Sequence, residues 1–251
     1  MPGDPVPGGP RGSRAPGARA EPAGATVRLP VVGQLVGRWE TDPLWARFYD
    51  LTVEHPRLGD PVWRWGMGSD LSLLLAAVRS LGALPAGSRV LDVPCGGGVG
   101  LRGLRPGQGV DYVAADVSPA MLRRTTGLAE RLGVTDQLTT RVTDAADLPD
   151  PDGSYDVVLS LMGLHCFDDP RTAAAELARV VAPGGRLIGS TLVTDSGLRH
   201  EPGRRVGRAA GLLGPMCSRL ELHSWLRAAG LTRITLRSSG PVVHVRATRA
   251  A

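Results

Sequence analysis

The sequence predicts an α/β fold in which helices cover a doubly wound, mostly parallel sheet of seven strands. From residue 86 onward, short apolar segments alternate with segments of helical periodicity, which is typical of a parallel sheet. The chain then closes with two segments of alternating polarity, RITLRSS and VVHVRATR, joined by Gly240 and Pro241. This closure predicts an antiparallel terminal hairpin. A length of 251 residues and a hydrophobic content of 42% suffice for one such domain with additions.

Strands are expected where short apolar runs are flanked by turn-forming residues. They fall at 89–93, 111–117, 138–148 (where a strand runs into a loop), 155–162, 185–193, 233–239 and 242–249. Helices are expected over 69–84, 118–133, 169–185 (ending in a Pro-Gly-Gly stop) and 218–231. Ser69, Ser118 and Ser218 are the predicted N-caps of three of them. The GLRGL segment after the first strand predicts the start of a helix weakened by glycine.

Three further regions are set apart by their composition. Residues 1–30 are rich in Pro, Gly and Arg and have almost nothing to bury, which predicts a disordered tail. Residues 31–85 are expected to form an N-terminal helical cap, in which the aromatic residues of 39–51 belong to a lid or to a packed cap. Residues 194–218 are Arg- and Gly-rich and are expected to be irregular. The cap aromatics are Trp39, Trp45, Phe48 and Tyr49.

The charge is unevenly distributed. All 29 basic residues are arginine, and the net charge is +5. Residues 1–30 contribute +2 (four Arg, two acidic residues) and residues 194–219 contribute +3 (five Arg, two acidic residues), so the rest of the chain is neutral. This distribution argues against a broad nucleic-acid-binding face. Three widely spaced cysteines do not indicate a disulfide framework or a metal site, and no secretory pattern or apolar run of 18 residues occurs. We therefore expect a cytoplasmic protein without membrane insertion.

The segment VLDVPCGGGVG, residues 90–100, contains two overlapping glycine patterns. Gly98, Gly100 and Gly103 form G-x-G-x-x-G, which in a dinucleotide site begins directly after the strand and leads into a helix that holds a pyrophosphate. That reading leaves residues 94–97 as an unexplained spacer and places Asp92 beside a phosphate. The alternative pattern, D-x-x-C-G-x-G, starts at Asp92 and suits a cofactor with an amino group, a sulfonium and no phosphate.

The second register also gives roles to two later carboxylates. Asp116 ends the second expected strand, where it could accept hydrogen bonds from two ribose hydroxyls. Asp144 and Ala145 follow the third strand, where a carboxylate or backbone group could meet an adenine amine. In an open α/β sheet, ligands bind outside the carboxyl ends of the strands, so these positions converge. S-adenosylmethionine is the cofactor that this pattern implies.

Four segments carry a family resemblance: VLDVPCGGGVG, VAADVSPAML, TDAADLPDPDGSYDVVLSLMGLHCFDDP and ELARVVAPGGRLI. In this order and spacing the chain resembles the class I S-adenosylmethionine-dependent methyltransferases, of the small-molecule, quinone-biosynthesis-like group. The resemblance covers residues 89–188 and implies a Rossmann-like fold for 86–251, with 194–218 as a substrate-covering segment. Pro94 departs from the small residue common in the family, and the glycine-rich GVGLRG makes a poorer first helix than usual.

The resemblance implies a cofactor site made of loops after successive strands. Asp92, Gly96 and Gly98 would frame the methionine end, and Asp116, followed by Val117, would hold the ribose. Met121 would pack on the adenine or in the core, and Asp144 with Ala145 would contact the adenine, with Asp147 as a competitor to Asp144. The cofactor-binding set is Asp92, Cys95, Gly96, Gly98, Asp116, Val117, Met121, Asp144, Ala145 and Leu161. Within it, Cys95 is interpreted as a small buried residue, since no base stands near to activate it.

His165 follows the fourth strand and is the best candidate for a general base, with a structural role equally open. His200 is a weaker candidate, His223 and His244 are interpreted as structural, and nothing specific supports His55. The segment at 194–218 could bind an anionic group or be a solvated loop. Its arginines of interest are Arg199, Arg204, Arg205 and Arg208.

Methyl transfer from S-adenosylmethionine to a small organic acceptor is the expected function. One alternative is a protein of the same fold that binds S-adenosylmethionine without methylating. The other is an NAD(P)-dependent oxidoreductase, which the absence of any Tyr-x-x-x-Lys pair disfavours because the chain has no lysine. Nucleic-acid methylation is disfavoured as well, since LMGLH stands where an Asn/Asp-Pro-Pro-aromatic motif would follow the fourth strand.

Overall fold

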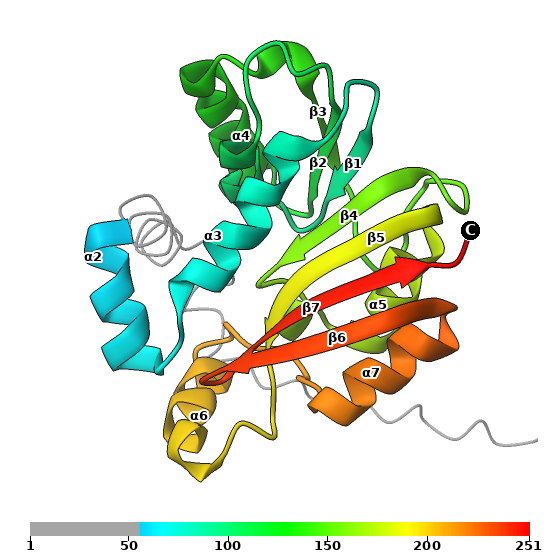
Figure 1. Ribbon diagram of the computed structural model, residues 1–251. Helices are drawn as coiled ribbons and strands as arrows, with labels where there is room; N and C mark the ends of the chain where they lie inside the picture. The colour runs from blue at the N-terminus through cyan, green and yellow to red at the C-terminus, as the bar shows by residue number, and fades with distance from the viewer. Residues whose placement is uncertain (1–55) are drawn as a thin grey trace, which may run out of the picture. The chain divides into compact units, whose positions relative to one another are not determined.

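A seven-stranded sheet organises residues 56–251, which are the residues that the computed structural model describes (Figure 1). The predicted tail, the aromatic segment at 39–51 and His55 lie outside the described residues. The strand order is β3-β2-β1-β4-β5-β7-β6, and β7 alone runs antiparallel to its neighbours. The strands are β1 (Arg89–Asp92), β2 (Asp111–Asp116), β3 (Leu138–Val142), β4 (Tyr155–Leu161), β5 (Val181–Leu192), β6 (Leu231–Ser239) and β7 (Val242–Arg249). The predicted fold class is therefore confirmed.

Helices cover both faces of the sheet and enclose two apolar cores (Figure 1). On one face, α3 (Leu71–Arg79) and α4 (Pro119–Leu132) pack on side chains such as Val90 and Leu159. On the other face, α5 (Pro170–Arg179) and α7 (Arg219–Ala228) pack on Leu91 and Val158. The central strand β4 is buried at six of its seven positions, which explains its almost uninterrupted apolar sequence.

The helix starts follow local capping chemistry. The Ser118 hydroxyl accepts a hydrogen bond from Met121 N at the start of α4, and Ser218 forms a reciprocal capping box with Glu221 at α7, so both predicted caps are confirmed. The predicted Ser69 cap is wrong. Asp70 caps α3 instead, its side chain accepting from Ser72 N, while Ser69 N donates to the carbonyl of Trp63 and is thereby drawn into the preceding turn.

Three predicted elements differ in extent. The helix expected over 169–185 stops at Arg179, and β5 starts at Val181 because that residue already pairs with Tyr155. GLRGL forms only a short 3₁₀ helix, η4 (Val99–Gly103). The segment expected to be irregular contains η7 (Leu198–His200) and α6 (Glu201–Ala209), whose first turn has a proline and whose Glu201 pairs with arginines further along the helix.

The remaining elements are short. They are α2 (Pro56–Pro61), a π-helical turn η2 (Val62–Met67), and the 3₁₀ turns η3 (Ser80–Ala83), η5 (Thr135–Gln137) and η6 (Leu164–Cys166). Between residues 56 and 251, no helix is both long and apolar enough to cross a membrane.

Candidate active site

The loop after β1 is shaped by two glycines with positive φ angles. Gly96 has φ +52° and Gly98 has φ +89°, conformations that residues with side chains rarely adopt. Open space surrounds the position where a Cβ of Gly96 would lie, whereas a Cβ on Gly98 would come within 3.1 Å of Thr125 in α4. Thr125, which is fully buried, donates its hydroxyl hydrogen to the Gly96 carbonyl (2.8 Å). Gly96 is thus half-buried, with open space beside its Cα, in a loop that Thr125 anchors to α4. Sequence reasoning missed Thr125.

Asp116 at the end of β2 ties this loop to the neighbouring strand. Its Oδ2 accepts a hydrogen bond from Gly96 N (2.9 Å), its Oδ1 accepts one from Ser118 N (2.9 Å), and only 5% of the residue is exposed. These contacts fix the orientation of the carboxylate. The loop after β1 and the start of α4 are therefore held in a fixed relation by one carboxylate.

The glycines of the G-x-G-x-x-G pattern serve packing. A Cβ on Gly100 would lie 2.2 Å from the Tyr112 hydroxyl oxygen and 2.7 Å from Asp92 Oδ2. A Cβ on Gly103 would lie 2.0 Å from the backbone oxygen of Val78 in α3. The turn between them is the five-residue η4, so no α-helix begins there to receive a pyrophosphate. Close packing explains the pattern without a dinucleotide.

Asp92 is buried beneath the glycine loop. It is 1% exposed, and its Oδ2 accepts a hydrogen bond from the hydroxyl of Tyr112 (2.6 Å), which extends from the adjacent strand β2. The pKa of Asp92 is raised to about 7, mainly by burial. The hydrogen bond from Tyr112 opposes this rise and the nearby Asp116 contributes to it. Nothing local in the sequence signals Tyr112, whose partner lies 20 residues away. Contact between Asp92 and a cofactor stays a prediction.

The other predicted cofactor residues follow β2, β3 and β4 at the same edge of the sheet. Val117 is 48% exposed and Asp144 is exposed, its Oδ1 accepting from Ala146 N, while Met121, Ala145 and Leu161 are buried. Cys95 is buried as well, with its sulfur 3.6 Å from Thr125 Oγ1, and burial raises the pKa of its thiol well above the usual value. A thiol in this setting is a packing group and not a nucleophile.

A strained residue, which the sequence does not reveal, directly follows β4. Met162 has φ +53°, which is unfavourable for a side chain of its size, and its backbone N–H donates to Ser190 Oγ on β5 (3.0 Å). Gly163 follows with no room for a side chain, since a Cβ would lie 2.3 Å from Pro94. Strain of this kind collects at binding sites, where surrounding contacts enforce it.

His165, the predicted general base, is held inside the protein. It is 4% exposed, its Nδ1 accepts a hydrogen bond from Leu192 N (3.3 Å) and lies 3.2 Å from Thr191 Oγ1, and burial lowers its pKa to about 4. The ring is therefore neutral, with one nitrogen lone pair directed at the backbone of β5. This arrangement favours the structural interpretation. His200 is also engaged, between Ser196 O (2.9 Å) and Arg199 Nε (3.2 Å).

Glu201 engages three of the four arginines proposed to bind an anion. Its carboxylate pairs with Arg204 (2.9 Å), Arg205 (3.3 Å) and Arg208 (2.9 Å). Arg204 is 7% exposed and also donates to Ser196 Oγ and to the Val193 carbonyl. These contacts favour a structural role for this cluster.

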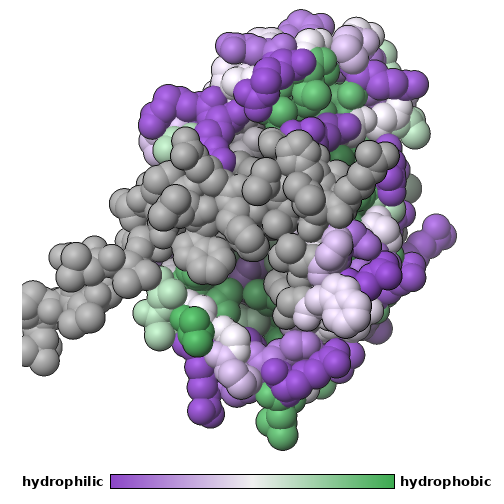
Figure 2. Space-filling view, turned by 90° about the vertical axis from the view of Figure 1, so that its left-hand side faces the viewer, coloured by the Kyte–Doolittle hydropathy of each residue, from purple (hydrophilic) through white to green (hydrophobic). Residues whose placement is uncertain are grey.

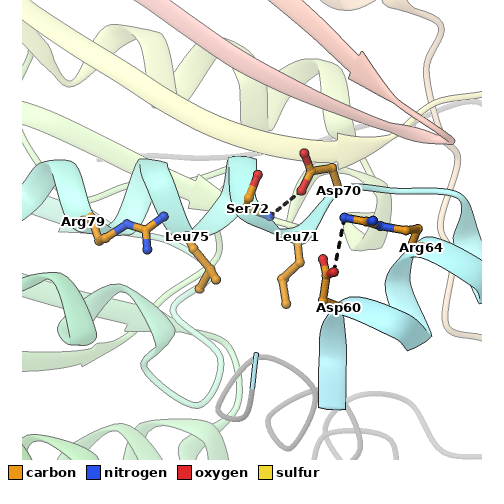
Figure 3. A pocket seen from close by; sticks show the side chains of 7 residues that line it. All are labelled: Asp60, Arg64, Asp70, Leu71, Ser72, Leu75 and Arg79. Carbon is orange, nitrogen blue, oxygen red and sulfur yellow. Dashed lines mark hydrogen bonds and ion pairs between the residues drawn. The ribbon is translucent and has the colours of Figure 1, made fainter. Parts of the chain in front are cut away.

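A cavity of about 360 Å³ lies between α2 and α3 (Figure 3). Asp60 and Arg64 form an ion pair across it (3.3 Å), and Asp70 accepts a hydrogen bond from Ser72 N (2.8 Å), as the dashed lines in Figure 3 show. Its acidic groups are thus already engaged, and it contains none of the predicted cofactor residues. The residues that line it are Asp60, Arg64, Asp70, Leu71, Ser72, Leu75 and Arg79.

Comparison with known proteins agrees with this geometry. Residues 91–189, from the end of β1 to β5, match a family described as a methyltransferase domain. This part of the chain thus matches a methyltransferase domain, and the match supports membership in the class I S-adenosylmethionine-dependent methyltransferases. The resemblance inferred from the four sequence segments is thereby confirmed. The match covers the glycine loop, Asp116 and the strained Met162 after β4, so the candidate site lies within the methyltransferase domain.

Two curated relatives and one solved structure place this domain among known proteins. The chain is 34% identical to 27-O-demethylrifamycin SV methyltransferase of Amycolatopsis mediterranei over 61% of its own length and 58% of that protein. It is 37% identical to demethylmenaquinone methyltransferase of Beutenbergia cavernae, over 57% of its own length and 52% of the relative. Among solved structures, phosphoethanolamine N-methyltransferase 2 of Haemonchus contortus aligns with a TM-score of 0.62 at 15% identity, covering 86% of this chain and 61% of that one. The chain thus spans about half the length of the curated relatives it matches.

The residues of this methyltransferase domain fit S-adenosylmethionine. Gly96 leaves open space for close approach, Asp116 offers carboxylate oxygens at the end of β2, and the exposed side chain of Asp144 follows β3. The loop offers backbone groups and carboxylates, and the short η4 replaces the helix that a pyrophosphate site requires. The donor set therefore suits a cationic nucleoside better than a phosphate.

Proposed function

We propose that this protein transfers the methyl group of S-adenosylmethionine to a small-molecule acceptor. The observation that carries the proposal is the bond between Gly96 N and Asp116 Oδ2, which unites the glycine loop and the end of β2 inside a methyltransferase domain. S-adenosylmethionine supplies an electrophilic methyl group when bound. The chain's own contribution is to hold and align the reactants, because alignment accounts for much of the acceleration in such reactions.

In this proposal, the predicted residues bind different parts of the cofactor. Asp116 binds the ribose hydroxyls, and the loop of Gly96 and Gly98, in which Gly96 leaves open space, accommodates the methionine end. Val117, Met121 and Leu161 supply apolar contacts, and Asp144 with Ala145 meets the adenine. Asp92 supports the loop from beneath through Tyr112, which keeps the position of Gly100 fixed. His165 positions β5 through its contact with Leu192 N and does not accept a proton from the acceptor.

The acceptor is proposed to lie between the helices that precede β1 and the segment at 194–218. These two regions are adjacent, since a Cβ on Gly68, just before α3, would lie 3.5 Å from Arg199 Nη2. Figure 2 shows apolar residues among polar ones on the side of the molecule where α2 lies. This supports the segment at 194–218 as a substrate cover and an acceptor with a substantial apolar part.

Calorimetry with S-adenosylhomocysteine and with NADH tests the cofactor directly, and we expect binding of S-adenosylhomocysteine alone. The Asp116→Asn variant removes the charge and one acceptor oxygen, so affinity should fall about 10- to 100-fold, on the scale of hydrogen bonds to a charged group (about 1.5–3 kcal/mol). Asp111→Asn, at the opposite end of the same strand, is the control and should bind like the wild type. Binding of NADH instead, or unchanged affinity in a folded Asp116→Asn protein, contradicts the proposal.

We further propose a cytoplasmic location and a function that involves no nucleic acid. The charge-neutral remainder of the chain outside residues 1–30 and 194–219 supports the second point. The absence of a nucleic-acid substrate is tested with radiolabelled S-adenosylmethionine. Transfer of the label to a small-molecule extract is compared with transfer to DNA and RNA. Label in nucleic acid would contradict this proposal.

A further inference from the structure

The two most exposed large apolar side chains among the described residues belong to neighbouring segments. Leu198 of η7 is 89% exposed and Trp65 of η2 is 87% exposed, and Val206 of the adjoining α6 is 69% exposed. Single apolar residues on a surface are ordinary, whereas several on one surface mark an interaction site. The positions of these three side chains relative to one another therefore decide their meaning.

A close approach between η2 and η7 places the three side chains near one another. A Cβ on Gly68, which follows η2, would lie 3.5 Å from Arg199 Nη2. Trp65 precedes Gly68 by three residues of a helical turn and Leu198 directly precedes Arg199, so the Cα atoms of Trp65 and Leu198 lie within about 20 Å of each other. Because α6 follows η7 without a break, Val206 lies within about 15 Å of Leu198 (Figure 1).

The Val206 side chain points to solvent because the opposite side of α6 faces the protein. Arg204 is 7% exposed and donates to the Val193 carbonyl, so its side of the helix is the buried one. Residues two positions apart on an α-helix project about 200° apart around its axis, which directs Val206 outward. Apolar residues accordingly stand out among charged ones at the lower end of Figure 2, the end where Figure 1 places α6.

The same surface is basic. Each of the three apolar residues has an exposed arginine directly beside it in the sequence: Arg64, Arg199 and Arg205. Residues 194–219 contain five arginines and two acidic residues, a net charge of +3, and Glu201 is shared among three of these arginines. Positive charge is therefore in excess around the apolar side chains. We call this surface the basic apolar patch, made of Trp65, Leu198, Val206, Arg64, Arg199 and Arg205.

An anionic lipid bilayer matches both properties of the basic apolar patch. Trp and Leu side chains are stabilised at the boundary between headgroups and acyl chains, and arginines are attracted to anionic headgroups. The apolar stem of an arginine can follow these side chains while its guanidinium stays among the headgroups. A second copy of the chain is disfavoured, because a two-fold contact through the patch would place its arginines against those of the other copy.

We propose that the basic apolar patch binds the surface of an anionic lipid bilayer, with Trp65 and Leu198 at the level of the headgroups. Binding of this kind is peripheral, because the side chains lie in the interface and the chain does not cross the bilayer. It gives a partner to arginines for which the sequence left an anionic group and a solvated loop as alternatives. The inference goes beyond methyl transfer and does not depend on it.

Co-sedimentation of the full chain with lipid vesicles tests the proposal. We expect binding to vesicles made of equal parts of phosphatidylcholine and phosphatidylglycerol, much weaker binding to phosphatidylcholine alone, and a loss of binding as the salt concentration rises. Trp65→Ser and Leu198→Ser should each weaken binding to the mixed vesicles about 10-fold, the scale of one apolar side chain removed from water. Arg199→Gln should weaken it about 5-fold, the scale of one arginine near an anionic surface. Trp65→Phe, which keeps an aromatic ring, should retain most of the affinity.

Matched control variants change residues of the same kind at the other end of the molecule (Figure 1). Val142→Ser removes a side chain that is 59% exposed at the end of β3, and Arg123→Gln removes an exposed charge on α4. Both variants should bind the mixed vesicles like the wild type. A general effect of lost hydrophobicity or charge would instead weaken all of the variants alike.

Equal binding to the two kinds of vesicle, or no binding to either, overturns the inference. Binding like that of the wild type by Trp65→Ser, Leu198→Ser and Arg199→Gln, each shown to be folded by its thermal transition, also overturns it. A dimer that forms without lipid and that these substitutions dissociate would assign the patch to a second copy and overturn it as well. Failure to bind S-adenosylhomocysteine would contradict the proposed function alone, so the two failures are distinguishable.

Discussion

Replacing Asp92 by Asn should remove a loss of stability that the wild type suffers as the pH rises. The native pKa of Asp92 is raised to about 7, mainly by burial, whereas an unfolded aspartate titrates near 3.9. Below about pH 4, the carboxyl group is protonated in both states. Between about pH 4 and pH 7, the unfolded state releases its proton while the native state keeps it, so the free energy of unfolding falls with pH. Above about pH 7 the loss levels off.

The magnitude follows from these two pKa values. Integrating the difference in bound protons from pH 5 to pH 8 gives a loss of about 2–3 kcal/mol assigned to Asp92. Native carboxylates with lowered pKa values, such as Asp150 and Glu176, act in the opposite direction, so the wild-type curve alone is not diagnostic. The quantity to measure is the difference between wild type and Asp92→Asn, in which the other groups cancel.

Urea unfolding at pH 5 and pH 8 measures that difference. The free energy of unfolding of Asp92→Asn, relative to the wild type, should increase by about 2–3 kcal/mol between the two pH values. Asp111→Asn, an exposed aspartate on the neighbouring strand, should stay within about 0.5 kcal/mol of the wild type at both. A relative stability of Asp92→Asn that is the same at pH 5 and pH 8 refutes the assignment of a raised pKa to this buried carboxylate.

Further predictions concern the loop, the cover segment and the buried histidine. In urea unfolding, Gly100→Ala should lower the free energy of unfolding by about 1–3 kcal/mol through overpacking, whereas Gly96→Ala should lower it by about 1–2 kcal/mol through its positive φ alone. The comparison is valid where the m-values are equal. A Gly100→Ala protein as stable as the wild type contradicts the prediction of overpacking. Glu201→Gln should leave the buried Arg204 poorly paired and speed hydrogen exchange of the α6 amides, while unchanged exchange would show that the ion pairs do not support the helix. Because burial lowers its pKa to about 4, His165 should show no titration in its NMR ring resonances between pH 5.5 and 8, and a midpoint near 6.5 would restore it as a candidate base.

Predictions from sequence held where the decisive contacts are local. Ser118 and Ser218 cap their helices through residues three positions away, and the terminal hairpin is fixed by alternation around Gly240 and Pro241. The predicted cap of α3 was wrong because Ser69 and Asp70 are adjacent and both residue types suit an N-cap equally well. The choice between them depends on Trp63 and Ser239, and Ser239 is 169 residues away from Asp70.

The prediction of an irregular segment where α6 lies was wrong for a different reason. Its glycines and arginines suggested a solvated loop, although the pair Glu201-Pro202 is a helix-start signal that was present in the sequence. The strained φ of Met162 had no local signal, because Ser190 of another strand holds its backbone N–H. The places of the predicted cofactor residues at strand ends could thus be read from the sequence, whereas the contacts that hold these residues could not.

Asp92 is predicted to favour a cationic cofactor, and its charge can do so without direct contact. Its position at the end of β1 suggested a carboxylate in direct contact with a cationic cofactor, but the side chain is buried and bonded to Tyr112. A carboxyl group with a pKa of about 7 is partly ionised near neutral pH, and Asp116 lies close enough to raise that pKa. Two carboxyl groups beneath and beside one glycine loop make its potential negative, which attracts a sulfonium and repels a pyrophosphate. We predict that this negative potential discriminates between the two classes of cofactor without direct contact between Asp92 and the cofactor.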